Sequence, residues 1–402
     1  MSQPPGFVSY SHPSNYVCKL QKSLYGLKQA PRAWNEKFTS FLPGLGFNAS
    51  FSDPSLFVKK HPTGIVILLL YVDDIILTGS SSSLISEVVS ALTQAFDMKD
   101  LGNLHYFLGL QITYKSTGLF VSQTKYIQDL LAKVDMQDAK SCATPCLPYH
   151  RLSKIEGTLY HSPEQYRSIV GALQYLTFTR PDIAFAVNQC CQFMHNPLDI
   201  HVVAVKRILQ YLSGTLDFGI HFNSGPLHLQ AYSDADWAGD PNDRRSTSGY
   251  VVYLGNTPIS WASKKQHTVS RSSTEAEYRA LAITAAEVSW IRKLLCDLHV
   301  PLYDAHVLFC DNISAIALSS NPVFHSRVKH IEIDYHFVRE RVIRGDLAVQ
   351  NVSSKEQFAD ILTKGLSISL FQDHCSNLML GSHKHEIEGG CKGIKTQDQS
   401  NG

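Results

Sequence analysis

The order of expected strands and helices between residues 227 and 364 constrains the fold more than any other feature of the sequence. Strand-like stretches with apolar residues at alternate positions are expected at 227–234, in a hairpin at 249–262, at 307–310 and at 347–352. Helical periodicity is expected at 274–298, 312–319, 325–344 and 355–364. Strands followed by alternating helices and strands form layered domains, because each element must bury one apolar face. This part of the chain is therefore predicted to be α/β (mixed α+β) with a mixed sheet.

The chain as a whole is long enough for several domains. Its 402 residues exceed one ordinary domain, and 44% hydrophobic with 18% charged residues is a globular composition. A composition shift near Gly225-Pro226 marks the clearest boundary. We expect domains at 1–122, 123–225 (mainly helical) and 226–366, followed by a frayed tail at 367–402.

The first 122 residues mix helix and strand patterns. A helix is expected at 33–42, and two β-branched, apolar strands at 65–72 and 75–78. Asp73 and Asp74 lie between those two strands, in a tight turn, and the serine run at 80–83 opens another helix. A further strand pair is expected at 104–112 and 119–121. Two adjacent acids in a turn between buried strands are a candidate site.

Several classes of protein are excluded by the sequence. The N-terminus lacks the basic and apolar pattern of a signal peptide, and the longest apolar run, 65–72, is too short to span a bilayer. Nine cysteines, an odd number without C-x-x-C pairs, fit a reducing compartment. We expect an intracellular protein, cytoplasmic or nuclear, with no membrane partner.

The basic residues are clustered although the formal net charge is only +1. Lys264, Lys265, Gln266 and Arg271 lie between an expected strand and the long helix, and they are candidates for contacts to phosphates of a nucleic acid. The alternative is a solvated surface, which is the common role of such runs.

Four carboxylates in the C-terminal region form a candidate metal site. Asp234 is expected at a strand end, Glu277 near the start of the long helix, Asp311 after the strand 307–310 and Asp360 among apolar residues of the last helix. Each has an ordinary alternative, such as a loop acid, a helix-dipole partner or an N-cap. Gathered at one sheet edge, four acids would repel each other unless cations held them, and carboxylate oxygens suit Mg²⁺.

A second glutamate, Glu275, lies two positions before Glu277. The apolar stripe of the helix includes Leu281, four positions after Glu277, so Glu277 is expected to face the sheet. Glu275 is expected to point toward solvent and to serve as a dipole and capping partner.

Long runs of this region resemble the RNase H domain of copia-type retrotransposons. The runs are YSDADWAGDPNDRRSTSGYVVYLGNTPISWASKKQHTVSRSSTEAEYRAL, CDNISAIAL, HSRVKHIEIDYHFVRERV and QFADILTKGL. The resemblance implies that Asp234, Glu277, Asp311 and Asp360 bind two Mg²⁺ or Mn²⁺ ions. It also implies hydrolysis of the RNA strand of RNA–DNA hybrids, leaving 3′-hydroxyl ends.

The remainder of the chain is similar to the reverse transcriptase of the same family. YVDD, which contains Asp73 and Asp74, resembles the polymerase catalytic signature, and KLQKSLYGLKQAPRAWN and LGNLHYFLGLQI flank it as in the copia palm. GALQYLTFTRPDIAFAVN and HVVAVKRILQYLSGT resemble the thumb and connection. The resemblance therefore implies a palm at 1–122, a thumb/connection at 123–225, an RNase H-like domain at 226–366, and an RNA template and DNA primer as partners.

One departure from the family concerns the polymerase. A further aspartate upstream of the QPPGF segment completes the polymerase metal site in the family, and the sequence begins at that segment. We therefore expect a truncated palm that extends primers poorly, with Asp73 and Asp74 as a partial catalytic and metal-binding pair. Two alternatives remain open. One is RNA-directed DNA synthesis within a longer Pol polyprotein, and the other is an inactive nucleic-acid-binding remnant.

Overall fold

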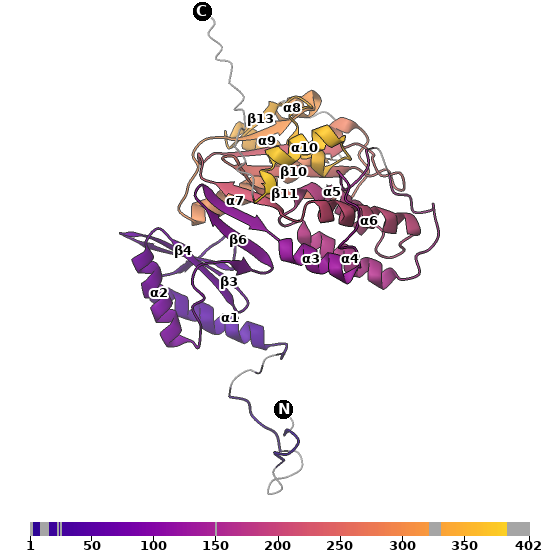
Figure 1. Cartoon of the computed structure of the whole chain (residues 1–402). Coiled ribbons are helices and arrows are strands. Elements are labelled where there is room, and N and C mark those ends of the chain that lie inside the picture. Colours follow the sequence, from indigo (N-terminus) through magenta and orange to yellow (C-terminus); the bar gives the residue numbers. More distant parts are fainter. Residues whose placement is uncertain are drawn as a thin grey trace, which may run out of the picture. The chain divides into compact units, whose positions relative to one another are not determined.

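The structure, a computed structural model, describes residues 3–8, 16–21, 24, 26–148, 151–320 and 331–383 (Figure 1). The chain forms two compact units. Unit 1 comprises Met1–Gly102 with Lys293–Val300, and unit 2 comprises Asn103–Arg292 with Pro301–Gly402. Among the helices of the described residues, none combines the length and the apolar character needed to cross a membrane.

Unit 1 contains a four-stranded antiparallel sheet in the order β1-β2-β3-β4, accompanied in the described residues by the helices α1 and α2 and by the end of α7 (Ser273–Asp297). Its elements are α1 (Ala30–Phe41), the 3-10 helix η1 (Leu42–Leu45), β1 (Asn48–Ala49), β2 (Leu56–His61), β3 (Gly64–Tyr71), β4 (Asp74–Gly79) and α2 (Ser82–Ala95). Alternate residues of β3 are buried, as are residues of α2 at four-residue spacing, so strand and helix share one core. The helix and the strand pair predicted around the two acids are confirmed, with slightly different ends.

The middle of the chain is mainly helical, as predicted. It contains α3 (Thr124–Lys133), α4 (Pro163–Leu176), the short 3-10 helix η2 (Pro181–Ile183), α5 (Ala184–Cys191) and α6 (Asp199–Gly214). Helices α3, α4 and α6 pack against one another in unit 2 (Figure 1). Pro163 begins α4, where a missing backbone N–H costs no hydrogen bond.

A five-stranded antiparallel sheet of unit 2 joins distant parts of the chain. Its order is β14-β8-β7-β6-β5, from β5 (Tyr106–Phe107), β6 (Leu110–Lys115), β7 (Gly118–Ser122), β8 (Phe218–Asn223) and β14 (Leu380–Ser382). The boundary predicted after residue 122 thus separates strands of one sheet, and the compact units divide after Gly102 instead.

The prediction of a frayed tail at 367–402 is wrong for its first part. Helix α10 (Ile368–Asn377) buries Phe371 and Cys375, and β14 pairs with β8. The periodicity of the sequence gives no signal for a strand as short as β14, because β14 is stabilised by pairing with β8, which is distant in sequence. The rest of the predicted tail, 384–402, lies outside the described residues.

The second sheet of unit 2 is mixed, with the order β11-β10-β9-β12-β13. Its strands are β9 (Leu229–Asp236), β10 (Thr247–Leu254), β11 (Thr257–Lys265), β12 (His306–Cys310) and β13 (Leu347–Asn351). Strand β9 is antiparallel to β10 and parallel to β12, and β12 is parallel to β13. The predicted mixed α/β class is therefore confirmed.

Among the described residues, the helices that accompany this sheet are α7 (Ser273–Asp297), α8 (Ile313–Ser320), α9 (Glu332–Ile343) and the 3-10 helix η4 (Phe358–Leu362). The helix predicted at 325–344 is described only from α9 onward, since residues 325–330 lie outside the described residues. The helix predicted at 355–364 is shorter and is a 3-10 helix. Because β9 and β12 are parallel neighbours, their carboxyl ends lie at the same edge of the sheet, which brings Asp234 near the end of β9 beside Asp311, the residue after β12.

Candidate active site

Asp234 lies on the central strand of the mixed sheet. It is opposite Gly249 of β10 and two residues before the end of β9, which corrects the prediction that it ends its strand. A Cβ atom on Gly249 would lie 2.6 Å from Cγ2 of Thr363. The missing side chain thus lets the segment after η4 approach the strand. Thr363 then donates a hydrogen bond from Oγ1 to Oδ2 of the buried Asp234.

Asp311 follows β12 directly and does not cap the next helix. Asn312 has that role, since its Oδ1 accepts a hydrogen bond from Ala315 N at 3.0 Å. The Asp311 carboxylate instead accepts a hydrogen bond from Oγ of Ser354, 3.2 Å away. The ordinary N-cap role therefore does not account for Asp311.

Glu277 lies in the first turns of α7 and is only 6% exposed. Burial, together with Asp234 and Asp311, raises the pKa of Glu277 to about 9. The backbone N–H of Ala235 donates to its carboxylate and opposes that rise. The helix phase expected from the sequence is thus correct for Glu277, which faces the sheet.

Asp360 lies in η4 and is paired with a lysine that the sequence reasoning missed. Nζ of Lys364 lies 2.8 Å from Oδ1 of Asp360 and 3.5 Å from Oδ2 of Asp234. Burial opposes the charge of Lys364, but Asp234 and Asp360 raise its pKa above the usual value. The only sequence signal for this contact is the four-residue spacing of Asp360 and Lys364.

The four predicted acids form one electrostatic cluster. Burial and then Asp234 raise the pKa of Asp360 to about 7, although Lys364 lowers it. The pKa of Asp311 is also raised, by burial and by Asp234. Carboxylates whose ionisation is opposed by burial and by one another are the groups that a divalent cation stabilises most. The structure thus brings together Asp234, Glu277, Asp311 and Asp360, as the sequence predicted.

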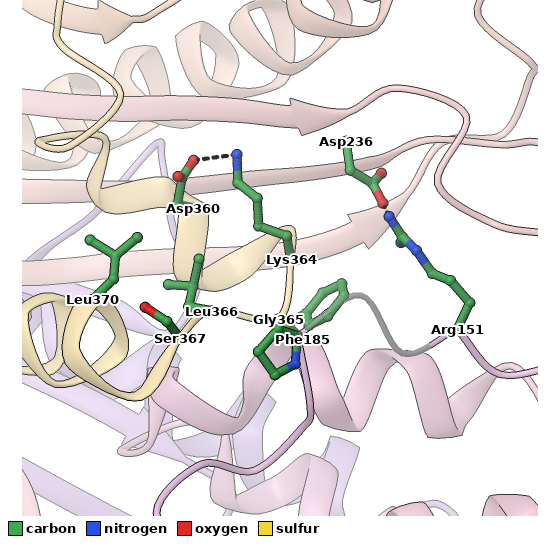
Figure 2. A pocket seen from close by; sticks show the side chains of 10 residues that line it. Arg151, Phe185, Asp236, Asp360, Lys364, Gly365, Leu366, Ser367 and Leu370 are labelled. Carbon is green, nitrogen blue, oxygen red and sulfur yellow. Dashed lines mark hydrogen bonds and ion pairs between the residues drawn. The ribbon is translucent and has the colours of Figure 1, made fainter.

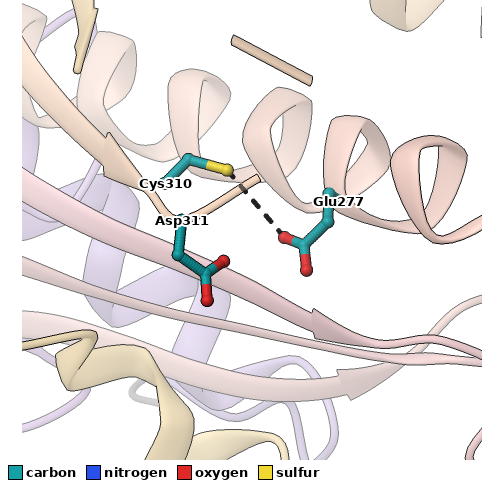
Figure 3. Close-up of side chains that lie close together, drawn as sticks. All are labelled: Glu277, Cys310 and Asp311. Atoms are coloured by element: carbon teal, nitrogen blue, oxygen red, sulfur yellow. Dashed lines mark hydrogen bonds between the residues drawn. The ribbon is translucent and has the colours of Figure 1, made fainter. Parts of the chain in front are cut away.

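A cysteine lies among these acids. Ligand atoms of Glu277, Cys310 and Asp311 are all within 4.8 Å of one another (Figure 3). The Cys310 thiol is a weak donor to Oε2 of Glu277 at 4.0 Å, and burial followed by Glu277 raises its pKa. Its position at the end of β12, next to Asp311, was the available sequence signal, but a buried strand cysteine is usually only a packing residue.

Glu275 is placed differently from the prediction. It is buried rather than directed to solvent, and it accepts a hydrogen bond from Arg271 N at 3.0 Å. Its other oxygen pairs with Nη2 of Arg279 at 2.9 Å, and its own N–H is bonded to Ser272 Oγ. The expected capping role at the start of α7 is therefore confirmed.

Two of the four predicted nucleic-acid contacts have other partners. The side chain of Gln266 is buried and bonds Ser248, Ser270 and the backbone of α7, which corrects its prediction as a nucleic-acid contact. Lys265 is only 17% exposed and pairs with Asp240 and Asp243. Lys264 and Arg271 are exposed.

Asp73 and Asp74 belong to unit 1 and both are exposed: Asp73 lies in the turn after β3, and Asp74, predicted to lie in that turn, is the first residue of β4. Val72 has a φ of 53°, which is costly for a β-branched residue. The carbonyl of Val72 accepts a hydrogen bond from Nε1 of Trp34 on α1 at 2.7 Å. The core of unit 1 thus holds this turn in a strained conformation, a common feature of functional turns.

A pocket of about 370 Å³ borders the acid cluster of unit 2 (Figure 2). Charged side chains of two ion pairs line it, Arg151 with Asp236 and Lys364 with Asp360. Its remaining lining is mainly apolar and comes from Pro148, Phe185, Gly365, Leu366, Ser367 and Leu370.

Comparisons with known proteins identify the family of the chain. Residues 1–148 match the family described as reverse transcriptase (RNA-dependent DNA polymerase). The chain is 54% identical over 379 residues to a retrovirus-related Pol polyprotein from transposon RE1 of Arabidopsis thaliana. The aligned region covers 94% of this chain and 26% of that protein. It is 34% identical over 292 residues to a putative transposon Ty5-1 protein of Saccharomyces cerevisiae, covering 72% of this chain and 94% of that protein.

A solved structure that the comparison also matches is the foamy viral protease-reverse transcriptase in complex with RNA/DNA hybrid. It is 14% identical, with 82% of this chain and 39% of that chain covered and a TM-score of 0.40. The chain spans about a quarter of the length of the RE1 polyprotein, and nearly all of the shorter Ty5-1 protein. It therefore belongs to the copia-type retrotransposon Pol family and contains the reverse-transcriptase region and the RNase H-like region of that polyprotein.

Proposed function

We propose that unit 2 hydrolyses the RNA strand of RNA–DNA hybrids with the help of two divalent cations. The observation that supports this most is the cluster of Asp234, Glu277, Asp311 and Asp360, in which burial and neighbouring carboxylates raise the pKa values of the last three. Carboxylate oxygens are the ligands that Mg²⁺ and Mn²⁺ prefer. The donor set therefore fits two such ions, which these four side chains would hold.

The residues around the acids support the same function. Thr363 and Ser354 each donate to one oxygen of Asp234 and Asp311, respectively, which fixes the carboxylates and leaves their other oxygens for ligation. Bound divalent ions would supply charge stabilisation at the phosphodiester and a water molecule of lowered pKa. The protein's own contribution is to hold the ligands rigid and to position the phosphodiester beside them.

The test is cleavage of a labelled RNA–DNA hybrid in Mg²⁺ by the wild-type chain and by Asp311→Asn. We expect RNA products with 3′-hydroxyl ends and a loss of about 10²–10³ in rate for the variant, since one ligand charge is removed. Ser354→Ala, which removes only the hydrogen bond to Asp311, is the matched variant and should retain most activity. Equal rates for wild type and Asp311→Asn, or cleavage that survives EDTA, would contradict the proposal.

A second candidate function is RNA-directed DNA synthesis within a longer Pol polyprotein. It is favoured by the turn that presents Asp73 and Asp74, which the Trp34 hydrogen bond and the core of unit 1 hold in place. Primer extension on an RNA template by the longer polyprotein, lost in Asp74→Asn and retained in Asp53→Asn, would support it. Incorporation that is unaffected by Asp74→Asn would exclude this role for the turn.

A further inference from the structure

The segment that carries Arg151 is anchored beside the candidate active site. Asn242 holds it from both sides, because its Nδ2 donates to Leu152 O at 3.0 Å and its Oδ1 accepts from Lys154 N at 2.7 Å. Leu152 itself is buried. A Cβ on Gly365 would lie 2.5 Å from Leu147 O, so Leu147 also lies closely against the chain after η4.

Arg151 extends from this segment to the strand that carries Asp234. Nη1 of Arg151 lies 3.0 Å from Oδ2 of Asp236, two residues after Asp234 on β9. A side chain at position 239 would collide with both members of this ion pair. Glycine at this position therefore leaves space for the pair. The guanidinium has five N–H donors, and within the described residues it makes this single hydrogen bond. The Arg151 side chain is 37% exposed, so its other donors can reach a ligand.

The pocket lies between the two ion pairs, so the positively charged side chains of Arg151 and Lys364 line it together with apolar residues (Figure 2). Arg151 reaches it from the segment that Asn242 holds, and Lys364 reaches it from the chain just after η4. In the proposed function, Asp234 and Asp360, which are the present partners of Lys364, would hold divalent cations. Lys364 would then face the pocket without a carboxylate partner, and the pocket would attract an anion.

We infer that this pocket binds one backbone phosphate and the adjoining sugar of the nucleic acid, with Arg151 as the phosphate contact. This inference rests on the proposed function for the choice of ligand. An arginine fork matches the geometry of a phosphate, and the apolar lining formed by Phe185, Leu366 and Leu370 suits the carbon face of a sugar. A residue from outside the RNase H-like region thereby becomes part of its substrate site.

The experiment measures equilibrium binding of a hybrid to the full chain in Mg²⁺, in an Asp311→Asn background so that the ligand stays intact. Arg151→Gln should weaken binding about tenfold, as expected for a lost charged hydrogen bond. The slope of log affinity against log salt should fall by about one unit. Lys154→Gln, an exposed lysine on the same segment, is the matched control and should change neither quantity.

A second measurement locates the phosphate. Hybrids that each carry one neutral methylphosphonate linkage should reveal one position whose replacement weakens binding to the Arg151 protein and has no effect on the Arg151→Gln protein. Coupling between Arg151 and the linkage at a single position identifies a direct contact. Arg151→Lys keeps a charge and should show an intermediate effect. If Arg151→Gln does not fold, the affinity of Arg151→Lys for the same hybrids tests the phosphate contact instead.

Three results would overturn the inference. One is an affinity and salt slope of Arg151→Gln equal to those of Lys154→Gln, and another is the absence of any coupled methylphosphonate position. The third is an equal loss of affinity in Asp236→Asn, since Arg151 would then act only through its partner. Wild-type cleavage is measured separately. If the wild type fails to cleave hybrids, the proposed function fails, while the coupling to one phosphate remains measurable with the wild-type chain.

Discussion

The ammonium group of Lys364 lies 2.8 Å from the carboxylate of Asp360, where it compensates part of the charge of the acid cluster. Removing it in Lys364→Gln leaves buried carboxylates without that compensation. We expect the variant, without divalent metal, to lose about 1–2 kcal/mol of unfolding free energy, between the values for exposed and buried pairs. Thermal melts with and without Mg²⁺ measure this, and Mg²⁺ should restore most of the loss. Lys355→Gln, an exposed lysine close in sequence, is the control; an equal melting temperature for both variants would contradict the prediction.

Two glutamates in the first turns of α7, Glu275 and Glu277, should have separate effects on activity and on stability. Glu277→Gln removes a member of the acid cluster and should abolish hybrid cleavage while the protein stays folded. Glu275→Gln loses the bond to Arg271 N and the pair with Arg279, so it should keep its cleavage rate and lose about 1 kcal/mol of stability. Rates under identical Mg²⁺ and melting temperatures of both variants provide the measurement. The reverse pattern would assign the metal role to Glu275.

The raised pKa of Glu277 predicts how the stability of the metal-free protein depends on pH. From its ordinary value of 4.5 up to about 9, the folded protein holds a proton that the unfolded chain has lost. The unfolding free energy therefore falls as pH rises through this window. Melts in EDTA should show the decline, and it should be smaller in Glu277→Gln. A stability that is equally pH-dependent in the variant would show that Glu277 is not responsible.

Metal binding should release protons for the same reason. Carboxylates bind Mg²⁺ in their ionised form, and burial raises the pKa values of Glu277 and Asp360 to about 9 and about 7. The heat of Mg²⁺ binding near neutral pH should therefore depend on the ionisation enthalpy of the buffer. Glu277→Gln should reduce that dependence. Buffer-independent heats in the wild type would indicate that these carboxylates are already ionised before metal binds.

Cys310 should make the site sensitive to thiophilic metals. Soft ions such as Cd²⁺ bind thiolates, and coordination removes the thiol proton despite the raised pKa. Cd²⁺ added to a cleavage assay in Mg²⁺ should inhibit the wild type at lower concentration than it inhibits Cys310→Ser. Cys296→Ser changes an exposed cysteine and should behave as the wild type. Equal inhibition of all three proteins would mean that Cd²⁺ acts elsewhere.

The sequence by itself determined the order of the elements and the identity of the acids. Strand and helix periods are local, so β3, β9 and α7 were found within a few residues, and Leu281 fixed the direction of Glu277. The signature around Asp73 and Asp74 also lies within a few consecutive residues. Such features depend on neighbours along the chain, which the sequence displays directly.

Only the tertiary structure decided which distant groups meet at the site. Arg151 reaches Asp236, Thr363 reaches Asp234 and Lys364 lies between two carboxylates because separate segments pack onto one sheet. Burial, a property of the folded chain, gave Gln266 and Glu275 structural partners and raised the pKa of Glu277. The pairing of β14 with β8 likewise depends on backbone hydrogen bonds between strands far apart in sequence, for which periodicity carries no signal.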